Sequence, residues 1–293
     1  MPKVSVIMSV YNNAPYLQEA VSSILCQSFR DFELLIFDDC STDGSSEILD
    51  SIKDPRVRVI HNSYNRGLVA NLNAGLDMAQ SKYIARMDGD DISYPDRFLL
   101  QIQFMDANPD IGLCSTAMQV STAGKPKINP LRHEDIQAWL LFHCCISHPV
   151  VMMRNSIIQQ HHIRYDANYP HAEDYELWNR VAPYVKMANL PEVLFYYRRH
   201  TGQVSSQHVK VQNDSAKRVR MREFNNLGLY PTEEEYKIHM RCVDFAINPH
   251  DPVHYYPALA WAEKLLAQNR VAKRFNQEAL NIALSRCISR LPY

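Results

Sequence analysis

Residues 83–91 read YIARMDGDD, a run of strand-forming residues that ends in three closely spaced aspartates. Such a run is typical of a strand that is buried on both faces of a parallel sheet. The pattern also occurs upstream, where residues 32–37 (FELLIF) lead directly into Asp38 and Asp39. Both stretches predict a parallel strand whose carboxyl end carries acidic side chains.

Strands and helices alternate over about the first 110 residues, at the spacing of right-handed βαβ units. The remaining predicted strands and helices of this region are residues 4–10, 17–25, 48–49, 57–60 and 68–79. The alternation predicts an α/β fold with a doubly wound parallel sheet. Ligands bind such sheets beyond the carboxyl ends of the strands. We therefore expect three polar clusters, residues 9–12, 38–41 and 88–91, to converge at one edge of the sheet.

The cluster at residues 88–91 is the sharpest chemical signal. Three carboxylates within four residues repel one another, and a divalent cation among them relieves that repulsion. Oxygen ligands of this kind suit Mg²⁺ or Mn²⁺, which commonly also bind substrate phosphates. The alternative is a solvated acidic turn in which Asp91 caps the following helix. Residues 88–91 alone do not decide between a metal site and a turn.

Two other acidic clusters also allow more than one interpretation. Asp38 and Asp39 stand where a carboxylate can accept hydrogen bonds from a base or a ribose, although Ser41 or Asp43 can also serve as a helix cap. Residues 173–174 (Glu-Asp) can supply a general base, or can simply follow the preference for acidic residues at a helix start.

The basic segment at residues 197–200 (YRRH) can approach a pyrophosphate through its cations. His200 is either a metal ligand or a packing or phosphate contact.

The remaining strand prediction is residues 112–120. From about residue 204 the strand pattern fades, and residues 258–290 predict a helical C-terminal region.

Composition excludes several other classes of protein. The 31 basic and 32 acidic side chains give a net charge of −1, which argues against a nucleic-acid binder. The eight glycines form no G-x-G motif and no Walker A loop, so glycine-based dinucleotide and phosphate cradles are excluded. Seven cysteines without a C-x-x-C pair indicate reduced thiols in a cytoplasmic protein. We expect no signal peptide and no membrane span.

The order of these motifs resembles that of the family 2 glycosyltransferases, and in particular of those that build bacterial cell-surface polysaccharides. The resemblance covers about residues 3–205. The matching residues are Val4-Ser5-Val6-Ile7 with Tyr11-Asn12, Asp38-Asp39-x-Ser41-x-Asp43, Asn65-Arg66-Gly67, Asn71-x-Asn73-x-Gly75, Tyr83-Ile84, Asp88-x-Asp90-Asp91 and Glu173-Asp174. The resemblance implies a GT-A fold, a nucleotide-sugar donor that is most often a UDP-sugar, Mn²⁺ or Mg²⁺, and inversion at the anomeric carbon.

The resemblance also implies roles for individual residues. Ser9, Tyr11 and Asp39 would hold the uracil and ribose, with Arg66 as a further contributor. Asp88 would contact the ribose or sugar and, with Asp90, the metal. Asp174 matches the catalytic base, and Arg198 and His200 fall where some members place a last phosphate or metal contact.

Two positions depart from the family pattern. Ser9 replaces a common proline or threonine, and Cys40 replaces the usual glycine. The Q-x-x-R-W motif of processive synthases is absent, which favours transfer of a single sugar to a glycan or lipid-linked acceptor. The implied organisation is a nucleotide-sugar-binding half (1–110), an acceptor-binding half (111–204) and a helical subdomain (205–293).

Two other functions stay open on the sequence alone. One is a sugar-1-phosphate nucleotidyltransferase, although that class normally has a glycine-rich loop near its start. The other is a non-catalytic nucleotide-binding scaffold. Separately, residues 263–290 carry six basic and two acidic side chains. That excess could place the C-terminal helices on an anionic membrane, whereas a solvated helix packed on the catalytic domain is the alternative.

Overall fold

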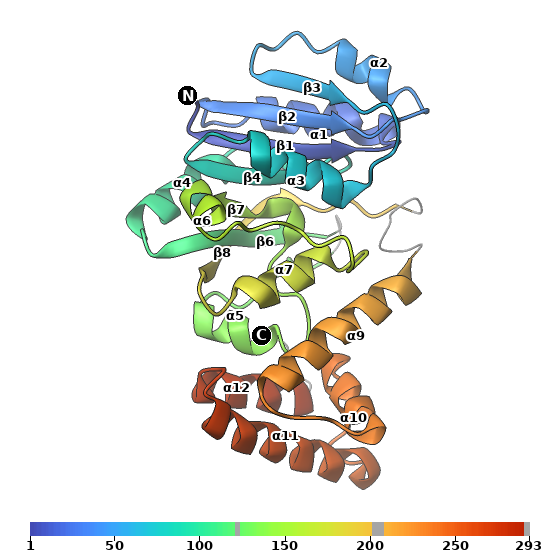
Figure 1. The fold of residues 1–293 in the computed structure, drawn as a ribbon, viewed down its shortest axis with the longest axis vertical. Coiled ribbons are helices and arrows are strands. Elements are labelled where there is room, and N and C mark those ends of the chain that lie inside the picture. Colours follow the sequence, from blue (N-terminus) through green and yellow to red (C-terminus); the bar gives the residue numbers. More distant parts are fainter. Residues whose placement is uncertain (121–123, 201–207, 290–293) are drawn as a thin grey trace.

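The computed structural model describes residues 1–120, 124–200 and 208–289 (Figure 1). Its N-terminal half alternates strands and helices in the expected order. The elements are β1 (Val4–Val10), α1 (Ala14–Leu25), β2 (Phe32–Asp38), α2 (Ser45–Asp50), β3 (Val57–His61), α3 (Leu68–Met78) and β4 (Tyr83–Asp88). β1 lies between β2 and β4, β2 pairs with β3, and all three pairings are parallel. The predicted parallel sheet is confirmed.

Helices cover both faces of this sheet. Side chains alternate along a strand, so Ile7 of β1 packs with Leu72 and Leu76 of α3, whereas Val6 packs with Leu17 of α1. α4 (Arg97–Ala107) joins α1 on its face through three buried side chains, Phe98, Ile102 and Met105. The sheet is therefore doubly wound, as the alternating sequence predicts.

The contact between α3 and β1 requires a residue without a side chain at position 75. A Cβ on Gly75 would lie 2.5 Å from Cγ2 and 2.8 Å from Cδ1 of Ile7, which is 2% exposed. We expect Gly75→Ala to lower the free energy of unfolding by about 1–3 kcal/mol through overpacking, measured by urea unfolding. In a double-mutant cycle, Ile7→Ala should absorb most of that cost. An equal cost in both backgrounds would contradict the steric explanation.

The second half of the chain extends the sheet with strands of both directions. Its elements are β5 (Ile92–Ser93), β6 (Ile111–Gln119), α5 (His133–Trp139), the 3₁₀ turn η1 (His148–Val150), β7 (Met152–Arg154), α6 (Asn155–Gln160), α7 (Glu173–Val181) and β8 (Lys186–Tyr196). The strand order is β3-β2-β1-β4-β7-β6-β8-β5. β7 is antiparallel to β4 and β6, and β5 is antiparallel to β8. The complete sheet is therefore mixed, and its N-terminal half, β1 to β4, is parallel throughout.

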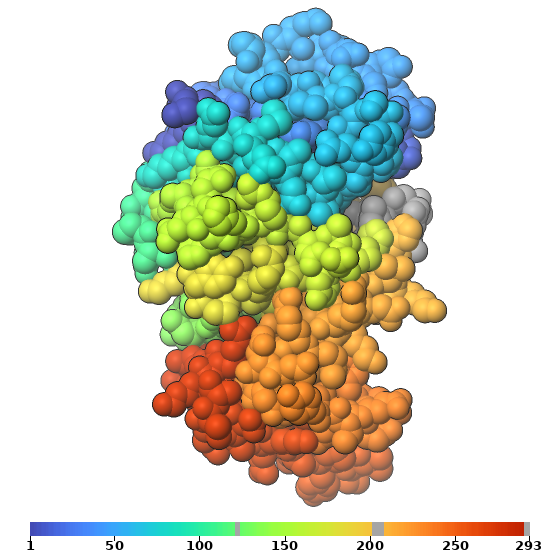
Figure 2. Space-filling model, in the orientation of Figure 1, coloured from blue at the N-terminus to red at the C-terminus, as the bar shows by residue number. Residues whose placement is uncertain are grey.

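The C-terminal region is helical, as expected. It contains α9 (Val209–Asn226), α10 (Glu233–Val243), α11 (Pro252–Ala272) and α12 (Gln277–Ile288). These helices lie at one end of an elongated molecule (Figure 2). In the described part of the chain, every helix is too short or too polar to cross a membrane.

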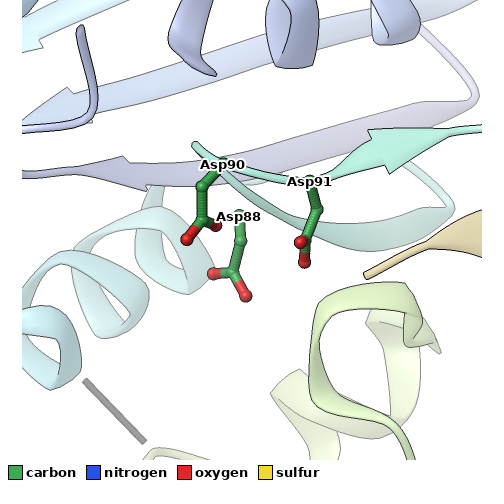
Figure 3. Close-up of side chains that lie close together, drawn as sticks. All are labelled: Asp88, Asp90 and Asp91. Carbon is green, nitrogen blue, oxygen red and sulfur yellow. The ribbon is translucent and has the colours of Figure 1, made fainter. Parts of the chain in front are cut away.

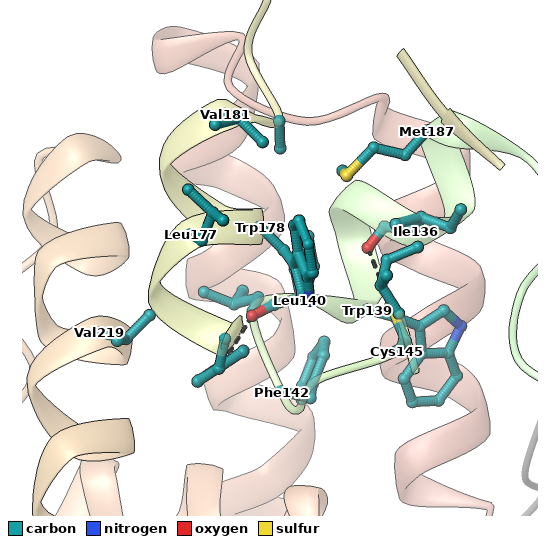
Figure 4. Close-up of a cluster of buried hydrophobic side chains, with 14 of the residues drawn as sticks. Ile136, Trp139, Leu140, Phe142, Cys145, Leu177, Trp178, Val181, Met187 and Val219 are labelled. Carbon is teal, nitrogen blue, oxygen red and sulfur yellow. Dashed lines mark hydrogen bonds between the residues drawn. The ribbon is translucent and has the colours of Figure 1, made fainter. Parts of the chain in front are cut away.

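The C-terminal helices share a hydrophobic core with the sheet domain. Leu177 and Trp178 of α7 lie between Ile136 and Trp139 of α5 on one side and Val219 of α9 on the other (Figure 4). One buried cluster runs from Ile7 in β1 through these residues to Leu284 in α12. The sheet and the helical region are thus packed as a continuous body.

Candidate active site

The register of the parallel strands brings three predicted polar positions to one edge of the sheet. Ser9 in β1 pairs with Phe37 of β2 and with Asp88 of β4, and the next residue, Val10, pairs with Asp38. The Ser9 hydroxyl accepts a 3.0 Å hydrogen bond from Asn71 Nδ2 of α3. The carboxyl ends of β1, β2 and β4 therefore form the floor of one polar site, as expected.

Asp39 organises the loop beside this floor. It is 2% exposed, and its carboxylate accepts hydrogen bonds from Asn62 Nδ2 (2.9 Å) and from the backbone N–H groups of Arg66 and Gly67 (both 2.8 Å). The Arg66 side chain is exposed, and Tyr11 is 50% exposed on the neighbouring turn. Asp39 therefore fixes the shape of the loop that presents Arg66.

Asp43 is not the N-cap residue of α1 or α2, whose N-caps are Asn13 and Gly44, but its carboxylate accepts hydrogen bonds from the first N–H group of each helix. Its Oδ2 accepts a 2.9 Å hydrogen bond from the N–H of Ala14, the first residue of α1, and its Oδ1 accepts one from the N–H of Ser45. The Asp38 carboxylate, in contrast, accepts from Ser46 (2.6 Å) and contacts His61 Nδ1 (2.9 Å). The hydrogen bond between Ala14 and Asp43 therefore connects the turn after β1 to the turn after β2.

Asp88, Asp90 and Asp91 form a compact acidic cluster at the end of β4 (Figure 3). One carboxylate oxygen of each lies within 4.8 Å of the others. Asp91 is fully buried, and its Oδ2 has no hydrogen-bond partner among the described residues. Hard oxygen donors that converge in this way, including a buried oxygen left unpaired, fit a divalent cation such as Mg²⁺ or Mn²⁺.

The helix-capping alternative for Asp91 is wrong. The following helix, α4, begins after Asp96, whereas Asp91 Oδ1 accepts a 2.9 Å hydrogen bond from the N–H of Arg198. Burial, followed by repulsion from Asp88 and Asp90, raises the pKa of the Asp91 carboxyl well above its ordinary value. A bound cation would reverse that shift, because it stabilises the charged form.

The segment after β8 lies over the acidic cluster. β8 pairs with β5, the strand that directly follows Asp91. Arg198 Nε donates a 2.8 Å hydrogen bond to the backbone oxygen of Asp90, and His200 Nε2 lies 2.9 Å from Asp90 Oδ2. The fold therefore places Arg198 and His200 beside the acidic cluster.

A buried arginine forms an ion pair with one member of the acidic cluster. Arg86, which is 5% exposed, forms a two-pronged ion pair with both carboxylate oxygens of Asp88. Its Nε is buried and has no partner in the described part of the chain. The guanidinium also interacts electrostatically with Glu173 and Asp174. Arg86 is thus the cation shared by the strand-end acids and the acids of α7.

Asp174 stands in the first turn of α7 and is half-buried. Its Oδ1 accepts a 2.7 Å hydrogen bond from the N–H of Tyr175, and Cys144 Sγ lies 3.5 Å from its Oδ2. Burial raises the pKa of the Asp174 carboxyl, against the effect of these two donors. A carboxylate that is held in place and made more basic in this way is suited to accept a proton.

The neighbouring Glu173 is more deeply buried. It is 7% exposed, and His148 Nδ1 lies 4.0 Å from its Oε1. The other ring nitrogen of His148 contacts the Tyr165 hydroxyl at 3.0 Å. Burial and repulsion from Asp174 raise the pKa of Glu173 to about 7.

The raised pKa of Glu173 predicts a pH-dependent stability. The folded protein binds this proton more tightly than the unfolded chain, so the contribution is present below the ordinary pKa of 4.5 and is lost as the pH rises through about 7. We expect Glu173→Gln to remove up to about 3 kcal/mol of this loss. In urea unfolding, the variant should gain on the wild type between pH 4.5 and pH 8. A stability difference that does not change with pH would refute this assignment.

Three contributors to the site were not anticipated from the sequence. They are Arg86, the thiol of Cys144, and the buried oxygen of Asp91. Arg86 had a detectable signal, because a charged residue in an otherwise apolar predicted strand, two positions before Asp88, must share a sheet face with that aspartate. Cys144 had none, because its contact with Asp174 joins residues 30 positions apart.

Comparisons with known proteins identify relatives in sequence and in fold. Residues 5–164 match the family model described as Glycosyl transferase family 2. A relative from Escherichia coli, the UDP-Glc:alpha-D-GlcNAc-diphosphoundecaprenol beta-1,3-glucosyltransferase WfaP, is 30% identical over 220 residues, which are 72% of this chain and 82% of that protein.

Two solved structures share the fold across nearly the whole chain. TarS 1–349 from S. aureus, in complex with UDP-GlcNAc, has a TM-score of 0.66 at 16% identity and covers 99% of this chain and 93% of its own. The mannosyltransferase PcManGT from Pyrobaculum calidifontis, in complex with GDP-Man and Mn²⁺, has a TM-score of 0.58 at 15% identity, with 99% and 87% coverage. The expected GT-A architecture is confirmed.

Proposed function

The chain belongs to glycosyl transferase family 2, and on that premise we propose that it transfers one sugar from a UDP-sugar to a hydroxyl of a glycan or lipid-linked acceptor. The transfer would invert the anomeric carbon and would depend on a divalent metal. The observation that carries the proposal is the acidic cluster, whose carboxylates converge within 4.8 Å at the carboxyl edge of the sheet.

The metal would be held by Asp88, Asp90 and His200, with the buried Asp91 as a further ligand. The unpaired Oδ2 of Asp91 supports this assignment. Bound Mn²⁺ or Mg²⁺ would neutralise negative charge on the departing diphosphate. Arg198, held over the cluster through the Asp90 backbone oxygen, would add a second positive charge beside the diphosphate.

The donor nucleotide would lie along the ends of β1 and β2. Ser9, Tyr11 and Asp39 would contact the uracil and ribose, and Asp39 also holds the loop that presents Arg66. UDP is favoured over other nucleotides by the donor in the name of the E. coli relative and by the ligand of TarS. PcManGT binds GDP-Man, so the identity of the nucleobase has to be tested for this chain.

Asp174 would act as the general base. Its carboxylate would take the proton from the acceptor hydroxyl as that oxygen forms a bond to the anomeric carbon. The bond from this carbon to the diphosphate oxygen breaks at the same time, and UDP leaves with the bonding electrons. Attack from the face opposite UDP inverts the carbon. The oxocarbenium-like transition state is the one that glycoside hydrolysis also uses.

Thermal unfolding with nucleotides tests the donor and metal assignments together. We expect millimolar UDP with Mn²⁺ to raise the melting temperature, because a ligand at 100 times its Kd stabilises by about 2.7 kcal/mol. Asp90→Asn should abolish the Mn²⁺-dependent part of the shift. Asp31→Asn, the same change at an exposed residue just before β2 and at the opposite edge of the sheet from the acidic cluster, should retain it.

A panel of nucleotide sugars then identifies the donor through metal-dependent release of the nucleotide. A larger shift with GDP than with UDP would overturn the UDP assignment. Release of pyrophosphate from a nucleoside triphosphate and a sugar phosphate would identify a nucleotidyltransferase. No shift with any nucleotide would favour a non-catalytic scaffold.

A lipid-linked acceptor would place the reaction in the cytoplasm, at the inner face of the cell membrane, in surface polysaccharide synthesis. The surface proposed for membrane contact is the outward face of α11, where Val253, Tyr256 and Val271 are 71%, 66% and 77% exposed. Arg270 and Lys273 are exposed on the same stretch. Two other basic residues predicted for this role, Lys264 and Arg274, form ion pairs with Glu235 and Glu223 of the same chain, and Arg290 lies outside the described residues.

Vesicle sedimentation tests the membrane contact. The protein should bind vesicles that contain anionic phosphatidylglycerol, and Val271→Asp with Tyr256→Asp should weaken that binding. Failure of the wild-type chain to sediment with anionic vesicles would eliminate this part of the proposal.

A further inference from the structure

Cys144 lies beside the carboxylate of Asp174, which is the general base in the proposed function. It is half-buried in the loop between α5 and η1. Its single S–H hydrogen has two acceptors in reach, Asp174 Oδ2 at 3.5 Å and the backbone oxygen of Ile146 at 3.3 Å. A thiol is a weak donor, and an ionised acceptor strengthens a hydrogen bond. Ionisation of Asp174 therefore favours the bond to the carboxylate.

The loop that carries this thiol is fastened to its surroundings. The Tyr175 hydroxyl of α7 donates a 2.7 Å hydrogen bond to the Leu140 backbone oxygen. The backbone oxygen of Phe142 accepts from Arg220 Nε at 2.9 Å, and that of Cys145 accepts from Asn189 Nδ2 at 3.0 Å. Because Tyr175 is the residue after Asp174, the loop and the acid are locked to each other.

The thiol complements the other hydrogen bond to the acid. Oδ1 of Asp174 accepts from the N–H of Tyr175, so the backbone holds one oxygen and the thiol the other. The other titratable or charged groups that act on Asp174 from the elements around it are Arg86 and Asp88 of β4, Glu173 of α7 and Tyr165 of the preceding loop. A change of the Cys144 side chain leaves all four in place.

We propose that Cys144 is a positioning residue for Asp174. The S–H group of Cys144 holds the ionised carboxylate in the orientation that takes the proton from the acceptor hydroxyl. This inference rests on the proposed function. Burial, followed by the charge of Asp174, raises the pKa of the Cys144 thiol well above its ordinary value. The sulfur therefore keeps its hydrogen over the working pH range and acts as a donor, not as a nucleophile.

The experiment is the pH profile of kcat/KM for three variants. Cys144→Ala removes the donor to the charged form of Asp174, so we expect the acidic limb to move upward by about half a pH unit. Cys144→Ser keeps a donor and should return the limb toward the wild-type position. Cys145→Ala is the matched control, because its thiol points to the backbone oxygen of Ile136 instead. It should leave the limb unchanged.

A purely structural role predicts a different result. It would lower kcat or the melting temperature without moving the limb, or would move it equally in Cys144→Ala and Cys145→Ala, and either result overturns the inference. Cys144→Val, which fills the space without a donor, provides the same test if the alanine variant does not fold. Full activity of Asp174→Asn would instead overturn the proposed function. An inactive Asp174→Asn with an unmoved limb in Cys144→Ala refutes this inference alone.

Discussion

Asp174→Asn is expected to lower kcat for sugar transfer by about 10²–10⁴-fold, the usual contribution of a positioned general base. The amide has nearly the shape of the carboxylate but cannot take the proton of the acceptor hydroxyl. UDP should still bind with wild-type affinity, because the proposed donor residues lie at the strand ends and on the loop of Arg66. Steady-state release of UDP measures kcat, and calorimetry measures UDP binding.

The neighbouring carboxylate is the matched control for this assignment. Glu173 precedes Asp174 on α7, but it is buried and directed toward His148. Glu173→Gln should therefore retain most of the activity. If instead Glu173→Gln were inactive and Asp174→Asn active, the base would have to be reassigned from Asp174 to Glu173.

Arg86→Met is expected to have the largest effect on stability. The guanidinium is buried and pairs with both oxygens of Asp88, whose side chain is 26% exposed, and removal of the arginine leaves the charge of this half-buried carboxylate uncompensated. We expect a loss of about 3 kcal/mol in the free energy of unfolding, measured by urea unfolding without divalent metal. Arg58→Met, an exposed arginine on β3 of the same sheet, should change stability by less than about 0.5 kcal/mol.

Added Mn²⁺ separates the electrostatic cause from a packing cause. If the uncompensated carboxylates produce the loss, a divalent cation that binds them should recover more stability in Arg86→Met than in the wild type. A loss that is equal with and without Mn²⁺ would assign it to the missing side-chain volume. A loss below about 1 kcal/mol would show that Asp88 does not need this partner.

The parallel half of the fold was predictable because its strands are long, buried on both faces and separated by amphipathic helices. Once the strand order is known, register alone places Ser9, Asp38 and Asp88 at one edge. β7 and β8 carried no comparable signal. β7 has three residues, and β8 contains a proline at position 191 and pairs with β6 through shifts in register. Their positions depend on contacts between distant parts of the chain.

The acidic cluster could also be predicted only in part from the sequence. Its composition was compatible with a metal site and with a solvated turn, and local sequence could not distinguish a capping Asp91 from a buried one. The deciding contact comes from Arg198, 107 residues away. Likewise, the amide and backbone donors around Asp39 come from a loop about two dozen residues further on. Residue types were enough to propose a chemistry for this site, whereas the orientation of its side chains required the fold.

The continuous hydrophobic cluster from β1 to α12 bears on how this enzyme can be re-engineered. Leu177 and Trp178 pack on both the sheet domain and the C-terminal helices, while Asp174 stands one turn earlier on the same helix. The C-terminal helices therefore cannot be exchanged for those of another transferase as an independent module. A chimera that exchanges these helices must also carry a matching α7, and with it a new setting for Asp174.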